Sequence, residues 1–181
     1  MTAKTIPQDI LQRAANIKLA VFDVDGVFTD GRITLDEHGA ETKSFHVHDG
    51  YGIRLLLQYG IEVAILSARS TGAVEHRMRA LGIKHILQGK QSKGVALDQL
   101  VDDLGYEKAQ LAYAGDDIID VQAMTRVGLA IAVANAHPWT KKHAHWVGST
   151  PGGHGAVREI CELLLQAHGL LDEVFDYNLK C

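Results

Sequence analysis

Short apolar runs alternate along this chain with longer segments in which apolar residues recur at helical spacing. The apolar runs, typical of strands covered on both faces, are Leu19–Phe22, Ile61–Leu66, His85–Leu87, Leu111–Ala114 and Leu129–Ala132. The helical segments are Gly50–Gln58, Ser70–Leu81, Ser92–Leu104, Asp117–Thr125 and Gly155–His168. This alternation predicts an α/β fold, a doubly wound (Rossmann-like) parallel sheet sandwiched by helices, with right-handed connections.

One segment interrupts the alternation. Two short strand-like pieces, Arg32–Leu35 and Thr42–Val47, flank a polar turn that contains Gly39. They predict a β-hairpin at about residues 31–47 that projects from the first crossover and offers a partner surface or a cover for the site. The C-terminal tail, at about residues 170–181, is less polar than a loose tail, and we expect it to dock on something such as another subunit.

Length and composition narrow the class of protein. The 181 residues predict a single domain, 1–181. The net charge of −4 and the absence of a Lys/Arg run argue against nucleic acid or an anionic membrane as partner. No apolar stretch approaches the ~20 residues of a membrane span. Two cysteines, Cys161 and Cys181, suit a reducing, cytoplasmic location.

Polar side chains follow four of the predicted strands, where ligands bind in open α/β sheets. In chain order they are Asp23 and Asp25, then Ser67 and Arg69, then Lys90 and Lys93, then Asp116, Asp117 and Asp120. Taken alone, an aspartate there is usually a turn former or helix cap, and a lysine is a solvated residue. Together, these carboxylates would repel one another unless a cation lay among them, and carboxylate oxygens with waters describe a Mg²⁺ site.

Such a site suits phosphoryl transfer. Mg²⁺ can neutralise phosphate oxygens that would otherwise repel an attacking carboxylate, which then forms an aspartyl-phosphate. Asp23 and Asp25 are two residues apart on an extended chain, so their side chains point to the same side. One can therefore attack the phosphate while the other handles protons.

The segments DVDGV, LSARS, SK and GDDIID, in that order, resemble the motifs of haloacid dehalogenase-like phosphatases over about residues 19–133. The resemblance implies that Asp23 is the nucleophile and that Asp25 is the general acid/base. It also implies that Ser67 and Lys93 bind the phosphate.

The same resemblance implies a set of metal ligands. Mg²⁺ would be held by Asp23, by the backbone carbonyl of Asp25 and by Asp116. Asp117 and Asp120 would support this shell or orient its waters.

A finer resemblance covers nearly the whole chain. DGVFTDG, HVHDGYGIR, VEHR, QGKQSK, ANAHP and GGHGAVREIC together resemble the capless phosphatases of 3-deoxy-D-manno-octulosonate 8-phosphate. This implies hydrolysis of a small sugar acid phosphate on the route to lipopolysaccharide. It also implies a homotetramer in which neighbouring subunits cover the site, and to which the hairpin and the tail contribute.

Substrate contacts follow from the same resemblance. They would be made by His46, Val47, His48, Asp49, Gly50, Arg54, Arg69, Arg77 and Lys93. Arginine makes physical sense because its forked donors match the carboxylate of a sugar acid. Arg77 by itself would be an ordinary surface residue of a helix, but a tetramer could turn it toward a neighbour's site. His48 and His154 depart from the family pattern, in which arginine is common, and this bears on carboxylate recognition.

Two smaller patterns have alternative interpretations. His46 and His48 would share one face of a strand and could bind a transition metal, although zinc uses three or four ligands and no third is evident. The GGHG segment at 152–155 could bind an anion at a helix N-terminus or be a plain glycine turn.

Three functional alternatives remain. A nonulosonate 9-phosphate or another sugar phosphate could fit a similar site. A signalling receiver domain also places carboxylates, a hydroxyl and a lysine around Mg²⁺, but its phospho-accepting aspartate follows the third strand, which here is followed by QGKQSK. A catalytically inactive binding module would typically lack one of the carboxylates, and all are present.

Overall fold

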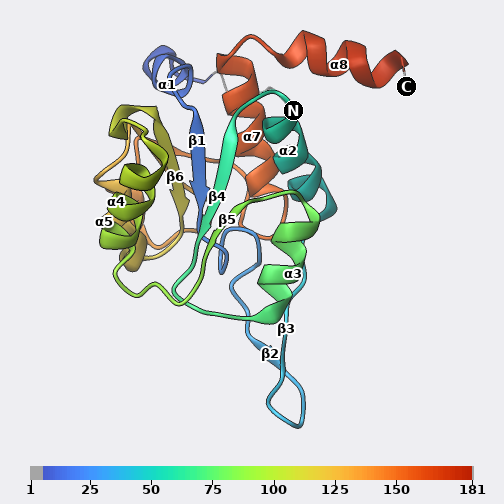
Figure 1. Ribbon diagram of the computed structural model, residues 1–181, viewed down its shortest axis with the longest axis vertical. Helices are drawn as coiled ribbons and strands as arrows, with labels where there is room; N and C mark the ends of the chain where they lie inside the picture. The colour runs from blue at the N-terminus through green and yellow to red at the C-terminus, as the bar shows by residue number, and fades with distance from the viewer. Residues whose placement is uncertain (1–5, 181) are drawn as a thin grey trace.

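A six-stranded parallel sheet forms the centre of the computed structural model, which describes residues 6–180 (Figure 1). Its strands are β1 Leu19–Phe22, β4 Glu62–Leu66, β5 His85–Leu87, β6 Leu111–Gly115, β7 Leu129–Ala132 and β8 Trp146–Val147. All neighbouring strands are parallel, in the order β5-β4-β1-β6-β7-β8. The predicted doubly wound sheet is therefore confirmed.

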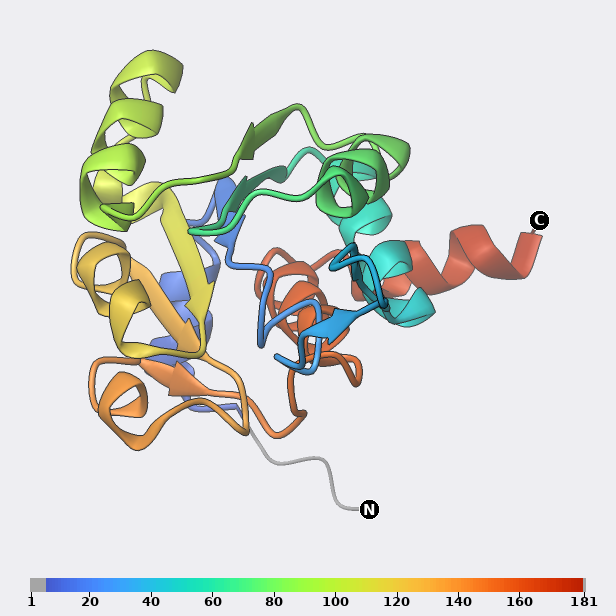
Figure 2. The ribbon, with the colours of Figure 1, turned by 90° about the horizontal axis from the view of Figure 1, so that it is seen from below.

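Helices cover both faces of this sheet. They are α1 Gln8–Ala14, α2 Val47–Gln58, α3 Gly72–Ala80, α4 Lys93–Leu104, α5 Val121–Met124, α6 Pro138–Lys141, α7 Ala156–Ala167 and α8 Leu171–Lys180, with 3₁₀-helices η1 Lys108–Gln110 and η2 Ile118–Asp120. Figure 2 shows α4 and α5 on one face and α2 and α7 on the other. None of the helices among residues 6–180 has the length and apolar character needed to cross a membrane.

The core lies between the sheet and these helices. All four residues of β1 are buried, as are all four of β7. Burying each large aliphatic side chain contributes roughly 1.5–3 kcal/mol, which is why strands that are apolar on both faces occupy the middle of the sheet. Gly105 ends α4 in the left-handed conformation, with φ at 73°, as its position after an apolar helical segment predicts.

The predicted hairpin projects from the body below the sheet (Figure 1). Its antiparallel strands, β2 Thr34–Leu35 and β3 Glu41–Thr42, are shorter than expected. The second piece was expected to extend to Val47, but α2 already begins there. The His46 side chain caps that helix by accepting a hydrogen bond from the His48 backbone N–H.

Several other boundaries differ from the predictions. The segment predicted as one helix over Asp117–Thr125 is the 3₁₀-helix η2 followed by the short α5. The predicted tail forms α8, which extends away from the body in both views (Figures 1 and 2), and Cys181 lies outside the described residues. Helices α1 and α6 and strand β8 were not predicted, because they are short and carry little periodicity.

Candidate active site

Most of the polar residues predicted to meet at one sheet edge do so, but Lys90 is exposed and is not among the residues that line the site. β1 is flanked by β4 and β6, so the strand order reverses beside it, and sheets of this kind bind ligands beyond the carboxyl ends at that point. A cavity of about 200 Å³ opens there. Its polar lining side chains are Asp23, Asp25, Ser67, Arg69, Asp116 and Asp117. Residues from three strand ends therefore share one cavity.

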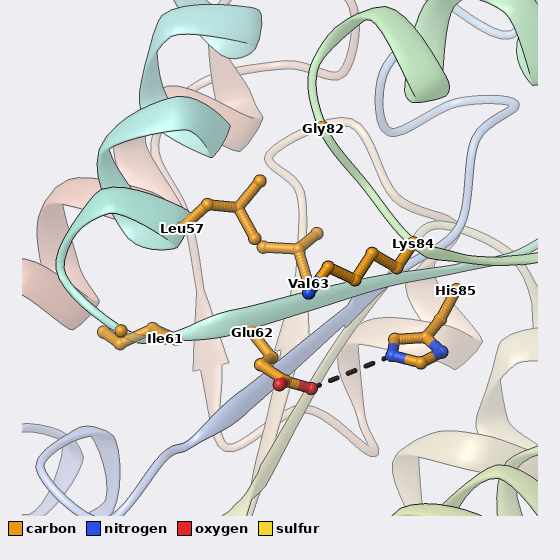
Figure 3. A pocket seen from close by; sticks show the side chains of 8 residues that line it. Leu57, Ile61, Glu62, Val63, Gly82, Lys84 and His85 are labelled. Atoms are coloured by element: carbon orange, nitrogen blue, oxygen red, sulfur yellow. Dashed lines mark ion pairs between the residues drawn. The ribbon is translucent and has the colours of Figure 1, made fainter.

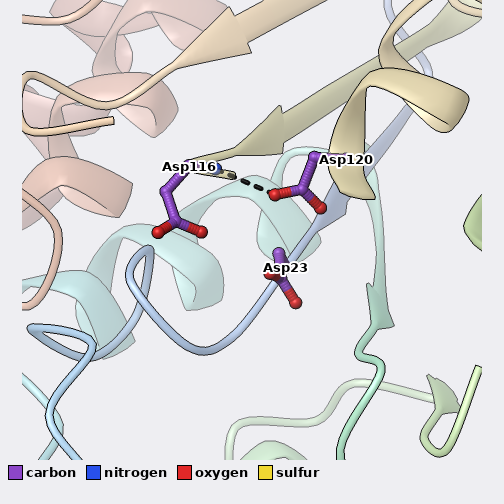
Figure 4. A group of neighbouring side chains, drawn as sticks. All are labelled: Asp23, Asp116 and Asp120. Atoms are coloured by element: carbon purple, nitrogen blue, oxygen red, sulfur yellow. Dashed lines mark hydrogen bonds between the residues drawn. The ribbon is translucent and has the colours of Figure 1, made fainter. Parts of the chain in front are cut away.

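Three aspartates form the centre of the site (Figure 4). One carboxylate oxygen each from Asp23, Asp116 and Asp120 lies within 4.8 Å of the others. Burial, then the charge of Asp120, raises the pKa of Asp23 to about 7, although Lys93 opposes the shift. Burial, then the charges of Asp120 and Asp23, raises the pKa of Asp116 to about 8. These carboxylates repel one another, and a bound cation would relieve that repulsion.

Lys93, the first residue of α4, lies between two of these acids with its side chain fully buried. Its Nζ is 2.8 Å from Asp23 Oδ2 and 2.5 Å from Asp120 Oδ1. Burial acts to lower the pKa of Lys93, but the attraction to the two carboxylates outweighs it and raises that pKa. The lysine therefore carries its charge at neutral pH, next to the cavity.

The four lone-pair positions of Asp120 are all used by protein groups. Oδ1 accepts from Lys93 Nζ and from the Tyr113 hydroxyl, at 2.5 and 2.7 Å. Oδ2 accepts from the backbone N–H groups of Asp116 and Asp117, at 3.0 and 3.1 Å. A carboxylate offers about four such positions, so Asp120 has none left for a cation. It holds Lys93 and the 116–117 loop in place, while Asp23 and Asp116 keep oxygens free.

Gly26 leaves the room that Asp116 needs. Its φ of +87° is the left-handed conformation that favours glycine, and a Cβ there would overlap the Asp116 carboxylate. The resulting oxygen donors, from Asp23 and Asp116 with waters, are those that a hard divalent cation such as Mg²⁺ prefers. The residues present thus fit a Mg²⁺ ion.

Asp25 lines the cavity, but its carboxyl faces the hairpin rather than the acid cluster. Lys43 contacts Asp25 Oδ1 and lies 2.7 Å from Glu41 Oε1. Arg69 pairs with the other oxygen of Glu41, and its Nε is 3.8 Å from Asp25 Oδ2. Hydrogen bonds from Lys43 and Arg69 lower the pKa of Glu41. The sequence interpretation missed Lys43 and Glu41, because nothing in the hairpin's polar pattern distinguishes them from solvated residues.

Ser67 and Asp117 also lie at the cavity. Ser67 is buried, and its hydroxyl accepts a hydrogen bond from the Arg69 backbone N–H at 3.2 Å. Asp117 caps η2, with Oδ1 accepting from the Ile118 N–H at 2.7 Å. The capping interpretation of Asp117 is thereby confirmed alongside its place in the lining.

The other predicted substrate residues are not among those that line this cavity. Val47 and Arg54 are exposed on α2. Asp49 is buried and accepts a hydrogen bond from the Arg158 backbone N–H at 2.8 Å, which ties α2 to α7. Arg77 of α3 lies against Gly50, where a Cβ would overlap its guanidinium group.

Local geometry decides between the alternative interpretations of the His46/His48 pair and of the GGHG segment. His46 and His48 belong to the cap and first turn of α2, so the prediction that they share one face of a strand is wrong. In the GGHG turn, the Gly152 N–H donates to Asn135 Oδ1 and the Gly153 N–H to the Val27 carbonyl, at 2.8 and 3.0 Å. Those N–H groups are not free for an anion, which favours the plain glycine turn.

A second hollow, of about 310 Å³, lies at the amino ends of β4 and β5 (Figure 3). Its charged lining consists of Lys84, Glu62 and His85, the last two 3.8 Å apart. A single carboxylate cannot assemble a divalent-cation site of the kind described above. Of the two hollows, the cavity beside β1 is the one that carries the cluster of carboxylates.

The order of the strands excludes a receiver domain. In receivers the first strand lies between the second and third core strands, giving the order 2-1-3-4-5. Here β1 lies between β4 and β6, which are the second and fourth core strands along the chain. The receiver alternative is therefore wrong.

Comparison with known proteins places the chain in a family. The profile of the haloacid dehalogenase-like hydrolases matches residues 85–160. The 3-deoxy-D-manno-octulosonate 8-phosphate phosphatase KdsC of Escherichia coli is 47% identical over 168 residues, which are 93% of this chain and 89% of the relative.

Solved structures agree with this relationship. That of the 3-deoxy-D-manno-octulosonate 8-phosphate phosphatase from Yersinia pestis has a TM-score of 0.90 at 47% identity, covering 92% of this chain and 90% of that one. The Moraxella catarrhalis phosphatase of the same name, in complex with magnesium, phosphate and a KDO molecule, has a TM-score of 0.93 at 41% identity, covering 95% and 99%. This chain belongs to the family of 3-deoxy-D-manno-octulosonate 8-phosphate phosphatases, within the haloacid dehalogenase-like hydrolases.

Proposed function

We propose that this protein is a Mg²⁺-dependent phosphatase that hydrolyses 3-deoxy-D-manno-octulosonate 8-phosphate to the free sugar acid and phosphate, in lipopolysaccharide biosynthesis. The observation that carries the proposal is the cluster of Asp23, Asp116 and Asp120 around the buried Lys93, at the edge where the strand order reverses. The identity to phosphatases with this substrate supplies the choice of sugar.

Asp23 is the nucleophile in this proposal. Its Oδ2 is held by Lys93, so the other oxygen is directed to the cavity and can attack phosphorus to form an aspartyl-phosphate. Asp25 gives a proton to the leaving sugar oxygen and later takes one from the water that hydrolyses the intermediate. Ser67 and Lys93 bind the phosphate oxygens.

The cation would be held by Asp23, by Asp116 and by the backbone carbonyl of Asp25. When bound, Mg²⁺ neutralises phosphate oxygens that would otherwise repel the attacking carboxylate. Asp120 and Asp117 fix the loop that carries Asp116, through the hydrogen bonds described above.

Arg69 is placed to recognise the carboxylate of the sugar, because its side chain is partly exposed in the cavity lining. We propose that the accessible residues among the remaining predicted substrate contacts act across subunits of a homotetramer. They are His46, Val47, His48 and Arg54 at the cap and on α2, and Arg77 on α3. Asp49 and Gly50 are buried within their own chain, and we propose that they support the start of α2 that presents these residues. Exposed apolar side chains on the nearby hairpin and helix, Ile33, Leu35 and Val47, support such an assembly.

A panel of sugar phosphates, assayed with and without Mg²⁺, tests this function. We expect the 3-deoxy-D-manno-octulosonate ester to have the highest kcat/KM, and EDTA to remove activity that added Mg²⁺ restores. Preference for a nonulosonate 9-phosphate would instead support the alternative substrate.

Asp23→Asn tests the mechanism. We expect turnover to fall at least about 10⁴-fold, because an amide cannot form the acyl phosphate. Circular dichroism and the melting temperature would verify that the fold is intact. Undiminished hydrolysis by this variant would contradict the nucleophile assignment.

A cytoplasmic location and the absence of nucleic-acid partners stay predictions from composition.

A further inference from the structure

A lysine is buried on a segment where its neighbours are exposed. Lys43 follows β3 of the projecting hairpin, and only 3% of its side chain is exposed, whereas Thr42 and Ser44 beside it are exposed. Lysine is almost never fully buried unless its charge is paired. The hairpin therefore directs this one ammonium group inward, to a particular partner.

That partner is the carboxyl of Asp25. Lys43 Nζ contacts Asp25 Oδ1 and also lies 2.7 Å from Glu41 Oε1. Glu41 in turn pairs with Arg69, whose Nε is 3.8 Å from Asp25 Oδ2. Two carboxylates and two cations thus alternate in a closed ring, which is neutral overall and leaves each charge between two of opposite sign.

The ring fixes where the Asp25 carboxyl lies. Asp23, only two residues away, belongs to the acid cluster, whereas Asp25 does not. Lys43 engages Oδ1, and the 3.8 Å separation from Arg69 is longer than a hydrogen bond, so Oδ2 stays free to carry or accept a proton. Lys43 can thus hold the Asp25 carboxyl in one orientation through Oδ1, while Oδ2 remains available for proton transfer.

We propose that Lys43 is a positioning residue for the reaction, which holds the Asp25 carboxyl over the leaving-group side of the cavity and so makes the hairpin part of the catalytic apparatus. The inference rests on the proposed function. Asp25 enters the first step with a proton on Oδ2. An Asp23 oxygen then bonds to phosphorus, the bond from phosphorus to the sugar oxygen breaks, and that oxygen takes the Asp25 proton, which leaves Asp25 as the carboxylate of the neutral ring. An error of about 1 Å in such a group costs up to 10²-fold in rate.

The leaving group distinguishes positioning from a merely structural role. A sugar oxygen needs a proton as it leaves, whereas the nitrophenolate of p-nitrophenyl phosphate leaves without one. For Lys43→Met we expect kcat/KM to fall about tenfold or more with the sugar phosphate and less than about threefold with p-nitrophenyl phosphate. Asp25→Asn serves as the reference and should show the same selectivity more strongly.

Three further variants complete the test. Lys43→Arg keeps the charge and should recover most of the activity toward the sugar phosphate. Glu41→Gln weakens the anchor of Lys43 and should give a milder form of the same selectivity, even if Lys43→Met folds poorly. Thr42→Ala, on the exposed side of the same strand, is the matched control and should behave as wild type.

The outcomes separate this inference from the function on which it rests. Equal losses with both substrates, or none with either, in Lys43→Met and Glu41→Gln would overturn the positioning role while leaving the phosphatase intact. A wild-type enzyme that hydrolyses no sugar phosphate would overturn the proposed function and this inference with it.

Discussion

Gly26 is the residue on which the position of Asp116 depends most directly. A methyl group there would overlap the Asp116 carboxylate. An alanine at this position would also have to adopt a left-handed φ, at a cost of roughly 1–2 kcal/mol. We expect Gly26→Ala to reduce kcat at least about 100-fold and to raise the Mg²⁺ concentration needed for half-activation.

Gly39→Ala is the matched control. Gly39 has a similar φ of +79°, but a Cβ there would meet no atom within 4 Å. This variant should lose a similar amount of stability and keep its activity. If both variants lost activity equally, backbone strain rather than the contact with Asp116 would be responsible.

The raised pKa values of Asp23 and Asp116, about 7 and 8, make metal binding depend on pH. Both carboxyls bind protons more tightly in the folded than in the unfolded state. Without metal, their contribution to the free energy of unfolding is therefore greatest below about pH 4 and declines as the pH rises toward 8. A divalent cation binds the ionised carboxylates, so its stabilising effect follows the opposite trend.

We expect Mg²⁺ to raise the melting temperature more at pH 8 than at pH 6. For a chain of this size, about 1 kcal/mol corresponds to a shift of roughly 2–4 °C. Thermal melts with and without Mg²⁺ at both pH values measure the effect, and Asp116→Asn should show little increase at either. A larger increase at pH 6 would contradict the assignment of these two acids.

Site residues could be predicted from the sequence where they directly follow a predicted strand, and not where a distant segment folds back to the site. Asp23, Ser67, Lys93 and Asp116 follow predicted strands, and parallel strands bring their carboxyl ends to one edge. Lys43 reaches the site only because the hairpin folds back, which no periodicity records. For Tyr113 the signal was present, as a lone hydroxyl within the apolar run 111–114, and buried tyrosines usually need a partner for it.

The turn before α7 supports the loop after β1. A Cβ on Gly152 would overlap the Gly26 carbonyl, and the Gly153 N–H donates to the Val27 carbonyl at 3.0 Å. Because backbone meets backbone there, neither side can yield by a rotamer change. We expect Gly152→Ala to lower stability by about 3 kcal/mol and to impair catalysis through the displaced loop.

Thermal melting and kcat measure this effect, with Gly72→Ala as the control. Gly72 has an ordinary φ, and a Cβ there would meet no atom within 4 Å. Wild-type behaviour of Gly152→Ala would show that the turn does not support the loop.

Elements were predicted as well as their patterns allowed. All five predicted runs became strands. Four of them are almost wholly buried, as their apolar character on both faces predicts, whereas β5 at the sheet edge is only partly buried. Strand β8 and helix α6, with two and four residues, are too short for any period to show. The start of α2 was missed because histidine, which caps it here, is not one of the residues that usually signal a helix start.

The exposed apolar hairpin side chains bear on how copies of the chain associate. Ile33 and Leu35 are 55% and 59% exposed. If they pack between subunits as proposed, replacing both with serine removes apolar contact area at every copy of the interface. We expect sedimentation velocity to show a tetramer for the wild type, as proposed, and smaller species for the double variant.

Val95→Ser provides the comparison for that experiment. Val95, on α4, is as exposed as Leu35, at 59%, but lies away from the hairpin. It should leave the assembly unchanged. A wild-type protein that sediments as a monomer, or a double variant that sediments as a tetramer, would contradict the proposed interface.

The central position of β1 has a consequence for the order of folding. Its two partners, β4 and β6, both come later in the chain, and β6 is followed directly by Asp116. During synthesis, a nascent chain that has emerged only through α4 carries Asp23 and Lys93, but its central strand still lacks the neighbour on one side. Parallel pairing over such sequence separations forms slowly. The acid cluster is therefore assembled late, and a chain halted before β6 leaves one edge of the wholly apolar β1 unpaired and exposed to aggregation.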